Sequence, residues 1–387
     1  MTVRRRSALV VAALIAAPVG AQEVVESQAP RDPVLTLADE PLVRIGIVDG
    51  PLEYIFGDVT SAVRLEDGSI VVADEQDSSL RKYDANGRHV WTSGRTGEGP
   101  GEYRGLRLVQ DCPGAGITVF DWRLNRFTQL DLDGEAVATR RALPPGSANP
   151  YATPACSPDG RLVFRQWPDD VGVYDEAVAV GEHYRWSTNL MWREGDNLAT
   201  LRSGIPGAER TRFYAEGSGP SWWGKDMVFT PVDTGVWYGT ADDYELEHLD
   251  WTGRATRIAR WNGPNLYVTD ERVDSFREAW LNRYDDPERR GNFERDTWPD
   301  IRDNLPESFP AYEAVFALPD GGVWVKTFVW RAPEDELHLL DRDGVWVRRL
   351  TLPGNAVVLD AGPNWVLLSQ RGELDAQTVA LYELVER

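Results

Sequence analysis

Short apolar runs that end in a polar residue recur along the chain and are separated by turn residues. The clearest unit covers residues 65–91 and predicts strand, turn, strand, loop, strand, turn, strand; the same order returns over residues 105–139. Runs of about five residues rich in β-branched and aromatic side chains are typical of strands buried on both faces. The pattern therefore predicts a repeated four-stranded antiparallel unit.

Aspartate-glycine and asparagine-glycine pairs punctuate these units. A two-residue type I′ turn requires positive φ at both central residues, which Asn, Asp and Gly tolerate best. Such pairs stand at residues 67–68, 86–87, 133–134, 159–160, 320–321 and 343–344. Each pair predicts a tight hairpin between two strands.

The number of second strands predicts the size of the ring. They stand at residues 70–74, 117–121, 162–166, 236–240, 323–327 and 365–369. This predicts an all-β fold, a six-bladed β-propeller of four-stranded antiparallel blades, with tryptophans packed between blades. The last unit has only three strands, so we expect a strand at residues 42–48 to pair in the last blade and close the ring.

The first two units resemble NHL-type repeats. The resemblance is carried by Asp-Gly-Ser-Ile-Val-Val-Ala-Asp-Glu at 67–75, Leu-Arg-Lys-Tyr-Asp-Ala-Asn-Gly at 80–87 and Gly-Glu-Gly-Pro-Gly-Glu-Tyr at 97–103. The resemblance is good over residues 59–139, and beyond them only the regular spacing of hairpin turns continues. It implies a six-bladed ring. Propellers of this type bind peptides, proteins, RNA or sugars and a few are enzymes, so the resemblance does not fix a function.

Residues 269–308 form an insertion between the fourth and fifth units. Thr269 is a suitable N-cap, and Asp270 and Glu271 follow it in the first turn of a predicted helix. The apolar side chains on one face of this helix are Val273, Phe276, Trp280, Leu281 and Tyr284. Pro299 is expected to open a second short helix. The insertion suits a lid over the ring mouth or a structural buttress, and we favour the buttress.

Residues 1–21 have the pattern of a secretory signal peptide. Three arginines at 4–6 precede an apolar run at 8–17, and small residues lead to a predicted cleavage after Ala21. We expect Sec-type export to the periplasm or the cell exterior, a flexible segment at 22–41 and the propeller at 42–387. The apolar run is far shorter than the roughly 20 residues that span a bilayer, so no membrane span is expected.

The charge and the cysteines agree with an exported protein. The formal net charge is −21, and removal of residues 1–21 takes away three arginines and no acid. Such an acidic surface repels nucleic acid and anionic lipid, which excludes a nucleic-acid partner. The two cysteines, Cys112 and Cys156, stand in equivalent turns of neighbouring units, and an oxidising compartment predicts a disulfide between them.

Carboxylates occur in every loop between a second and a third strand, and a closed ring places these loops on one face. The candidate ligand-binding residues of this face are Asp74, Glu75, Glu102, Asp121, Trp122, Arg123, Asp242, Trp330 and Arg331. The two Trp-Arg pairs offer stacking and ion pairing. Calcium prefers oxygen ligands and is a possible occupant of an acidic rim. The alternative for Asp74 and Asp121, which hold equivalent positions, is capping of local backbone amides.

The sequence contains no convincing catalytic motif. The four histidines lack metal-ligand spacing, no Gly-x-Ser-x-Gly elbow occurs, and residues 219–226 lack the hydroxyl that a phosphate loop needs. This favours a binding or scaffold module for a protein, peptide or glycan over an enzyme. The alternative is a calcium-dependent hydrolase or lactonase with its metal at the ring axis. Asp111 and Asp360 are its plausible inner-strand acids.

Overall fold

The computed structural model describes residues 22–141, 154–166, 178–195, 197–214, 217–282, 286–328, 334–354, 356–372 and 376–387. The predicted signal peptide lies outside these residues, as do Tyr284, Trp330 and Arg331. In the described part no helix is both long and apolar enough to cross a membrane.

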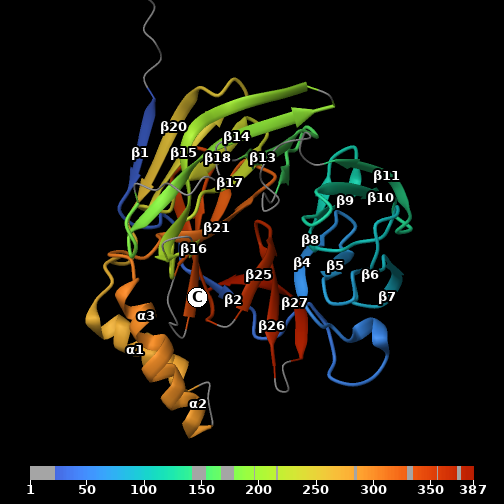
Figure 1. Ribbon diagram of the computed structural model, residues 1–387. Helices are drawn as coiled ribbons and strands as arrows, with labels where there is room; N and C mark the ends of the chain where they lie inside the picture. The colour runs from blue at the N-terminus through green and yellow to red at the C-terminus, as the bar shows by residue number, and fades with distance from the viewer. Residues whose placement is uncertain are drawn as a thin grey trace, which may run out of the picture.

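Consecutive strands form antiparallel sheets in chain order (Figure 1). The first sheet contains β4 (Val59–Arg64), β5 (Ile70–Asp74), β6 (Ser79–Tyr83) and β7 (His89–Ser93). The second contains β8 (Leu106–Cys112), β9 (Gly116–Asp121), β10 (Arg126–Leu130) and β11 (Ala136–Arg141). The third contains β12 (Ala155–Cys156), β13 (Leu162–Gln166), β14 (His183–Glu194), β15 (Asn197–Tyr214) and β16 (Gly217–Pro220).

The remaining strands follow the same plan and take in strands from the N-terminal end. The fourth sheet contains β17 (Val228–Val232), β18 (Gly235–Gly239), β19 (Glu245–Asp250), β20 (Ala255–Trp261) and β1 (Glu23–Ser27). The largest sheet joins β21 (Tyr312–Ala317), β22 (Val323–Thr327), β23 (Glu334–Leu340) and β24 (Trp346–Pro353), through β2 (Leu35–Leu37), to β27 (Gln377–Glu386), β26 (Trp365–Arg371) and β25 (Ala356–Ala361). Hairpins stand at the Asp-Gly and Asn-Gly pairs, as predicted, but their turns are not two-residue type I′ turns. Only the glycine of each pair has a positive φ, and the N–H of Gly68 donates to the carbonyl of Leu65, as in a type I turn followed by a left-handed glycine.

The first strands of successive groups contact one another in a closed circuit. β4 contacts β8, β8 contacts β12, and the circuit continues through β17, β21 and β25 back to β4. Apolar clusters fill the spaces between successive groups; one joins Val71 of β5 to Val119 of β9, and another joins Trp324 of β22 to Leu368 of β26. Trp324 is fully buried, which agrees with packing of tryptophans between sheets.

The strand predicted at residues 42–48 pairs with the last strand of the chain, as expected. β3 (Val43–Ile45) runs antiparallel to β27, with Ile45 opposite Val379. A second link crosses the same seam, because the buried side-chain oxygen of Gln377 accepts the backbone N–H of Val59 at 2.7 Å. The last strand of the chain is therefore fastened to residues 43–59.

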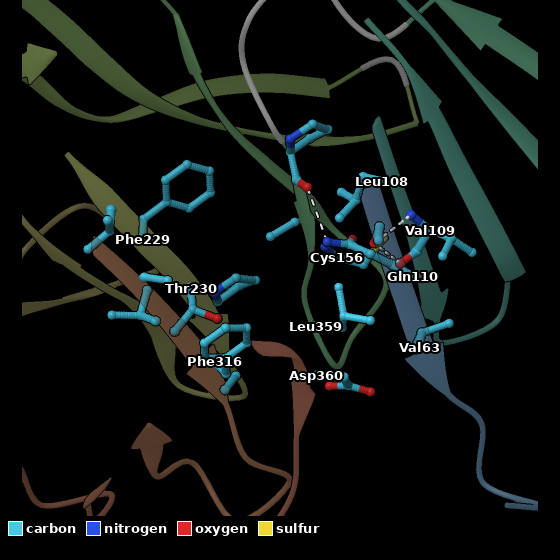
Figure 2. A pocket seen from close by; sticks show the side chains of 18 of the residues that line it. Val63, Leu108, Val109, Gln110, Cys156, Phe229, Thr230, Phe316, Leu359 and Asp360 are labelled. Atoms are coloured by element: carbon cyan, nitrogen blue, oxygen red, sulfur yellow. Dashed lines mark hydrogen bonds between the residues drawn. The ribbon is translucent and has the colours of Figure 1, made fainter. Parts of the chain in front are cut away.

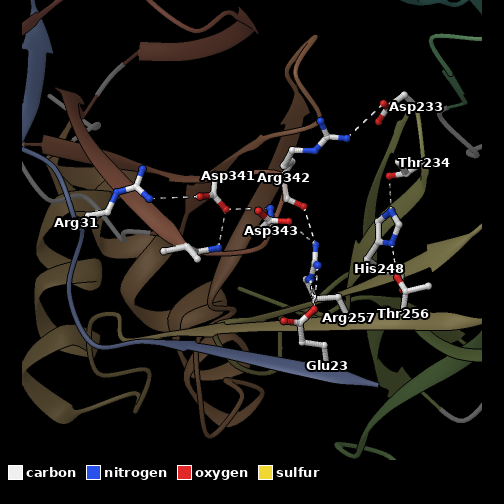
Figure 3. Close-up of polar contacts among 11 residues, drawn as sticks. Glu23, Arg31, Asp233, Thr234, His248, Thr256, Arg257, Asp341, Arg342 and Asp343 are labelled. Carbon is white, nitrogen blue, oxygen red and sulfur yellow. Dashed lines mark hydrogen bonds and ion pairs between the residues drawn. The ribbon is translucent and has the colours of Figure 1, made fainter. Parts of the chain in front are cut away.

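Residues 22–41 are not the flexible segment that the sequence suggested. β1 pairs in parallel with β20, and β2 lies between β24 and β27. Figure 3 shows ion pairs along this path, with Arg257 donating to Glu23 at 2.9 Å and Arg31 lying 3.7 Å from Asp341. The outer strands β20 and β24 would otherwise present unpaired backbone groups, and the N-terminal segment covers them.

The third sheet departs from the common plan. Its hairpin β14–β15 is much longer than the others and carries a further strand, β16, on β15. Arg185 of β14 donates to Asp242 at 2.8 Å and to the carbonyl of Thr240 at 2.9 Å. The long hairpin is thereby fastened to the turn between β18 and β19.

The helices lie together at one side of the sheets (Figure 1). They are α1 (Asp270–Leu281), α2 (Pro287–Asn292), the π-helix η2 (Phe293–Thr297) and α3 (Trp298–Asp303); a short 3-10 helix, η1 (Leu52–Tyr54), precedes β4. Thr269 caps α1 as expected, accepting the N–H of Arg272. The buried Phe276 packs against Trp223 with its ring centroid at 4.7 Å. This contact attaches the helices to the loop before β17.

Candidate functional site

A hollow bounded by the ring of first strands has a volume of about 600 Å³. Its lining comes mainly from β4, β8, β12, β17, β21 and β25, and we call it the axial cavity. No residue of α1, α2, η2 or α3 lines it. The volume lies within the range of small-molecule pockets in proteins, about 300–1,000 Å³.

The wall of the axial cavity is largely apolar. Figure 2 shows Val63 and Leu108 on one side, Phe229 and Phe316 on the other, and Leu359 between them. Adjacent residues of β25, Leu359 and Asp360, both line the cavity because the β25–β26 register shifts between Val358 and Asp360. A bulge of this kind re-aims side chains that simple alternation would send to opposite faces.

Asp360 is the most perturbed acid of the cavity. Its carboxylate accepts the backbone N–H of Arg64 at 3.0 Å and that of Ala361 at 2.9 Å. Burial nevertheless raises the pKa of Asp360 to about 7, and the negative charge of Asp111 adds to the rise. Solvent reaches part of the side chain through the cavity. A carboxyl group with this pKa changes charge near neutral pH.

Asp111 lies near the end of β8 and is exposed to the cavity. Its pKa is also raised, first by partial desolvation and then by the nearby acids Glu66 and Asp67. The two inner-strand acids that the sequence suggested, Asp111 and Asp360, therefore both line the axial cavity. In the described residues no group of three or more His, Cys, Asp or Glu side chains could hold a metal ion.

Two ion pairs neutralise the other acids of the lining. Arg165 of β13 donates to Asp226 at 2.6 Å, just before β17 begins. Glu313 of β21 pairs with Lys326, whose ammonium also lies 3.5 Å from Asp335. Arg165, Glu313 and Lys326 could not be recognised as neighbours of this site from the sequence, because only the assembled ring brings their strands to one place.

A covalent link and an amide fasten β8 to β12 beside the cavity. Cys112 and Cys156 form a disulfide with a Cα–Cα distance of 5.5 Å, which confirms the predicted pair. Gln110 donates to the carbonyl of Pro154 at 3.2 Å and accepts the N–H of Cys156 at 3.0 Å. β12 has only two residues, so these links hold in place a strand with few ladder hydrogen bonds.

The candidate rim residues Asp74 and Asp121 are buried and cap backbone amides. Asp74 accepts the N–H groups of Gly57 and Asp58 at 3.0 and 2.9 Å. Asp121 accepts those of Arg104 and Leu124 at 2.7 and 2.9 Å. Each carboxylate thus holds the loop that leads into the first strand of its own sheet, which is the capping alternative considered above.

Glu102 organises its own loop in the same way. It accepts the N–H groups of Gly99 at 2.8 Å and Glu98 at 3.0 Å, and it pairs with Arg95 at 2.7 Å. The hydrogen bond from Gly99 is the main cause that lowers the pKa of Glu102, and Arg95 lowers it further. Arg126 donates to carbonyl groups of the same loop.

Glu75, Trp122 and Arg123 form one cluster on the face of the second-to-third-strand loops. The indole N–H of Trp122 donates to Glu75 at 3.4 Å, and the guanidinium of Arg123 lies 5.0 Å from the Trp122 ring. Asp242 is paired with Arg185. The matching pair Trp330 and Arg331 lies outside the described residues, so ligand binding by this face stays a prediction.

Two solved structures are similar to this chain over most of its length. A member of the DUF4221 family from Bacteroides vulgatus gives a TM-score of 0.54 at 10% identity, covering 92% of this chain and 100% of the other. A protein from Bacteroides fragilis, described as exported, gives a TM-score of 0.50 at 13% identity, covering 95% and 100%. No protein-family model and no curated protein matches the sequence. At such identities the likeness shows the fold alone, which is of the β-propeller type.

Proposed function

We propose that this chain is an exported, six-bladed β-propeller that binds a small molecule in its axial cavity. The observation that carries the proposal is the cavity itself, about 600 Å³ with apolar walls and a few converging polar groups. Pockets of this size and character are the usual binding sites of small ligands. The protein acts as a binding module in this proposal.

The closed circuit of β4, β8, β12, β17, β21 and β25 supports six blades. Residues 42–387 would then make up the propeller, with residues 269–308 as a helical insertion. The packing of Phe276 on Trp223 favours a buttress role for the insertion. The same proposal includes that residues 59–139 are NHL-type repeats, as their resemblance to this family implies.

Export to the periplasm or the cell exterior is supported by the disulfide and by the predicted signal peptide. Disulfides such as Cys112–Cys156 persist in oxidising compartments and are rare in the cytosol. We therefore expect the mature chain to begin at Gln22, immediately before β1.

The binding proposal is tested by thermal shift of residues 22–387 against a panel of neutral, cationic and anionic aromatic compounds. Leu359→Trp fills the axial cavity, and Leu132→Trp makes the same exchange at a side chain that is 67% exposed. We expect compounds that raise the melting temperature of the wild type and of Leu132→Trp, but not that of Leu359→Trp. Equal shifts in all three proteins would contradict binding in this cavity.

A protein, peptide or glycan partner at the loop face is a second candidate. The stacking of Arg123 on Trp122 beside Glu75 favours it, because aromatic and arginine side chains are enriched where partners bind. Peptide and glycan arrays probed with the wild type and with Trp122→Ala/Arg123→Ala test it. A signal that the double variant loses supports the candidate, and arrays that stay blank for both proteins oppose it.

A further inference from the structure

The charges that line the axial cavity do not balance. Its acids are Asp111, Asp226, Glu313 and Asp360, and Arg165 is the one basic residue among the described lining. Asp226 is paired with Arg165, and Glu313 is paired with Lys326. Among the described residues, Asp111 and Asp360 have no ion pair of their own. Two carboxyl groups are therefore left to face the cavity without a cation.

The positive charge of Arg64 acts on Asp360 and lowers its pKa, but burial outweighs this effect and Arg64 forms no ion pair with the carboxylate. The backbone N–H of Arg64 binds Asp360, but its guanidinium lies over the Trp365 ring at 5.0 Å. The charges that act on Asp111 are negative, namely those of Glu66 and Asp67. A cation that enters the cavity gains attraction from both carboxylates, whereas an anion meets repulsion in a partly desolvated site.

An apolar wall lies next to this acidic pair. Leu359 directly precedes Asp360, and Val63, Leu108 and Phe316 line the same space. Burial of an apolar body against such a wall contributes about 25 cal/mol per Å² of area removed from water. The cavity therefore offers an apolar contact and a place for positive charge side by side.

We propose that the axial cavity binds an amphipathic organic cation, an ammonium with an aromatic or aliphatic body, whose charged end faces Asp111 and Asp360. This inference rests on the proposed function of the cavity. It assigns the ligand class by charge: protonated amines and quaternary ammonium compounds are preferred over neutral and anionic molecules of the same shape. The volume of about 600 Å³ admits a drug-sized molecule of this kind.

The test uses three compounds that share one body, namely 4-phenylbutylammonium, 4-phenylbutanol and 4-phenylbutyrate. Binding to residues 22–387 is measured by calorimetry at pH 8 and low salt, where Asp360 is mostly ionised because its pKa is about 7. We expect the ammonium compound to bind at least tenfold more tightly than the alcohol, and the carboxylate to bind least. Added salt should weaken the binding of the ammonium compound more than that of the alcohol.

Matched variants distinguish the effect of the two carboxylate charges on binding from an effect of the substitutions on folding. Asp111→Asn/Asp360→Asn keeps the shape of both side chains and should bring the affinities of amine and alcohol to within about threefold. Asp39→Asn/Glu40→Gln removes two exposed acids outside the cavity and should keep the wild-type preference. Melting temperatures of both variants show that each is folded.

The outcomes distinguish the two proposals. An alcohol that binds the wild type as tightly as the amine overturns the cation inference but leaves a binding cavity. A preference for amine that survives in Asp111→Asn/Asp360→Asn also overturns it. If none of the three compounds binds at millimolar concentration, the proposed function of the cavity fails together with the inference.

Discussion

The carboxylate of Asp360 accepts the backbone N–H of Arg64 at 3.0 Å, although 296 residues separate them. Asp360 stands near the end of β25, and Arg64 is the last residue of β4. These two strands meet where the circuit of first strands closes and belong to different sheets. A side chain that lines the axial cavity therefore also fastens the seam of the ring, so its charge affects both binding and stability.

Asp360→Asn should stabilise the protein increasingly as the pH rises to about 7. The folded-state pKa of about 7 is above the ordinary value of 3.8, so the stability that the protonated carboxyl provides is lost as the pH rises from about 3.8 to about 7 and changes no further above that. The amide cannot ionise. One pKa unit corresponds to about 1.4 kcal/mol, and water in the cavity screens part of the effect, so we expect a gain of about 2 kcal/mol at pH 8 relative to pH 4.5. Urea unfolding of both proteins at the two pH values measures it.

The opposite trend would mean that Asp360 is stabilised as an anion in the folded protein. In that case the variant would lose stability relative to the wild type between pH 4.5 and pH 8. The amide keeps one acceptor oxygen, so the variant can lose a hydrogen bond to Arg64 or Ala361. This loss changes the difference in unfolding free energy between variant and wild type by the same amount at every pH, and the pH trend can still be measured.

His248 should make the protein sensitive to acid. It is buried in β19 between the hydroxyls of Thr234 and Thr256, as Figure 3 shows. Burial lowers its pKa to about 4, and the positive charge of Arg257 adds to the effect. Between these pH values His248 binds a proton in the unfolded chain but not in the folded protein, so stability is lost as the pH falls from about 6.5 to 4.

Comparison with His248→Gln isolates this contribution from that of the carboxylates. We expect the wild type to lose about 2 kcal/mol more than the variant between pH 6.5 and pH 4, measured by urea unfolding. His89→Gln is the control, since His89 lies half-buried in the outer strand β7. A wild type and a His248→Gln variant with the same pH dependence would show that His248 does not cause the acid sensitivity.

Removal of the disulfide should destabilise the protein by about 2–4 kcal/mol. Cys112 and Cys156 are 44 residues apart, and the cross-link restricts a loop of this length in the unfolded chain. The melting temperature of the wild type should therefore fall on reduction, whereas that of Cys112→Ser/Cys156→Ser should start low and stay unchanged. A wild type insensitive to reductant would indicate that Gln110 and its neighbours hold β12 without the bond.

The hairpins were predictable because their signals are local. An Asp-Gly pair marks a tight turn because glycine adopts positive φ without strain, as Gly68 and Gly134 do. The predicted type I′ geometry was wrong, because Asp67 and Asp133 do not share the positive φ that this turn requires. The predicted second strands at 70–74, 162–166 and 323–327 agree residue for residue with β5, β13 and β22.

The cavity lining was less predictable because it depends on register. Register shifts occur in β4, β8, β21 and β25, each the first strand of its group of consecutive strands. A shift of one residue sends a side chain to the opposite face. The sequence could therefore name Asp111 and Asp360 as inner-strand acids, but not the residues that accompany them around the cavity.

The N-terminal segment was misjudged because its strands are short and take their partners from distant sheets. Leu35 shows why the segment is ordered: its side chain is 2% exposed and belongs to the apolar cluster that contains Leu350. Leu35→Ala should therefore cost about 3 kcal/mol of unfolding free energy, as is usual for a buried leucine. Leu42→Ala makes the same exchange at a side chain that is 60% exposed and should change stability by less than about 0.5 kcal/mol. If both variants unfold at the wild-type urea concentration, residues 22–37 do not contribute to the stability of the fold; a loss confined to Leu35→Ala would show that this segment is part of the core.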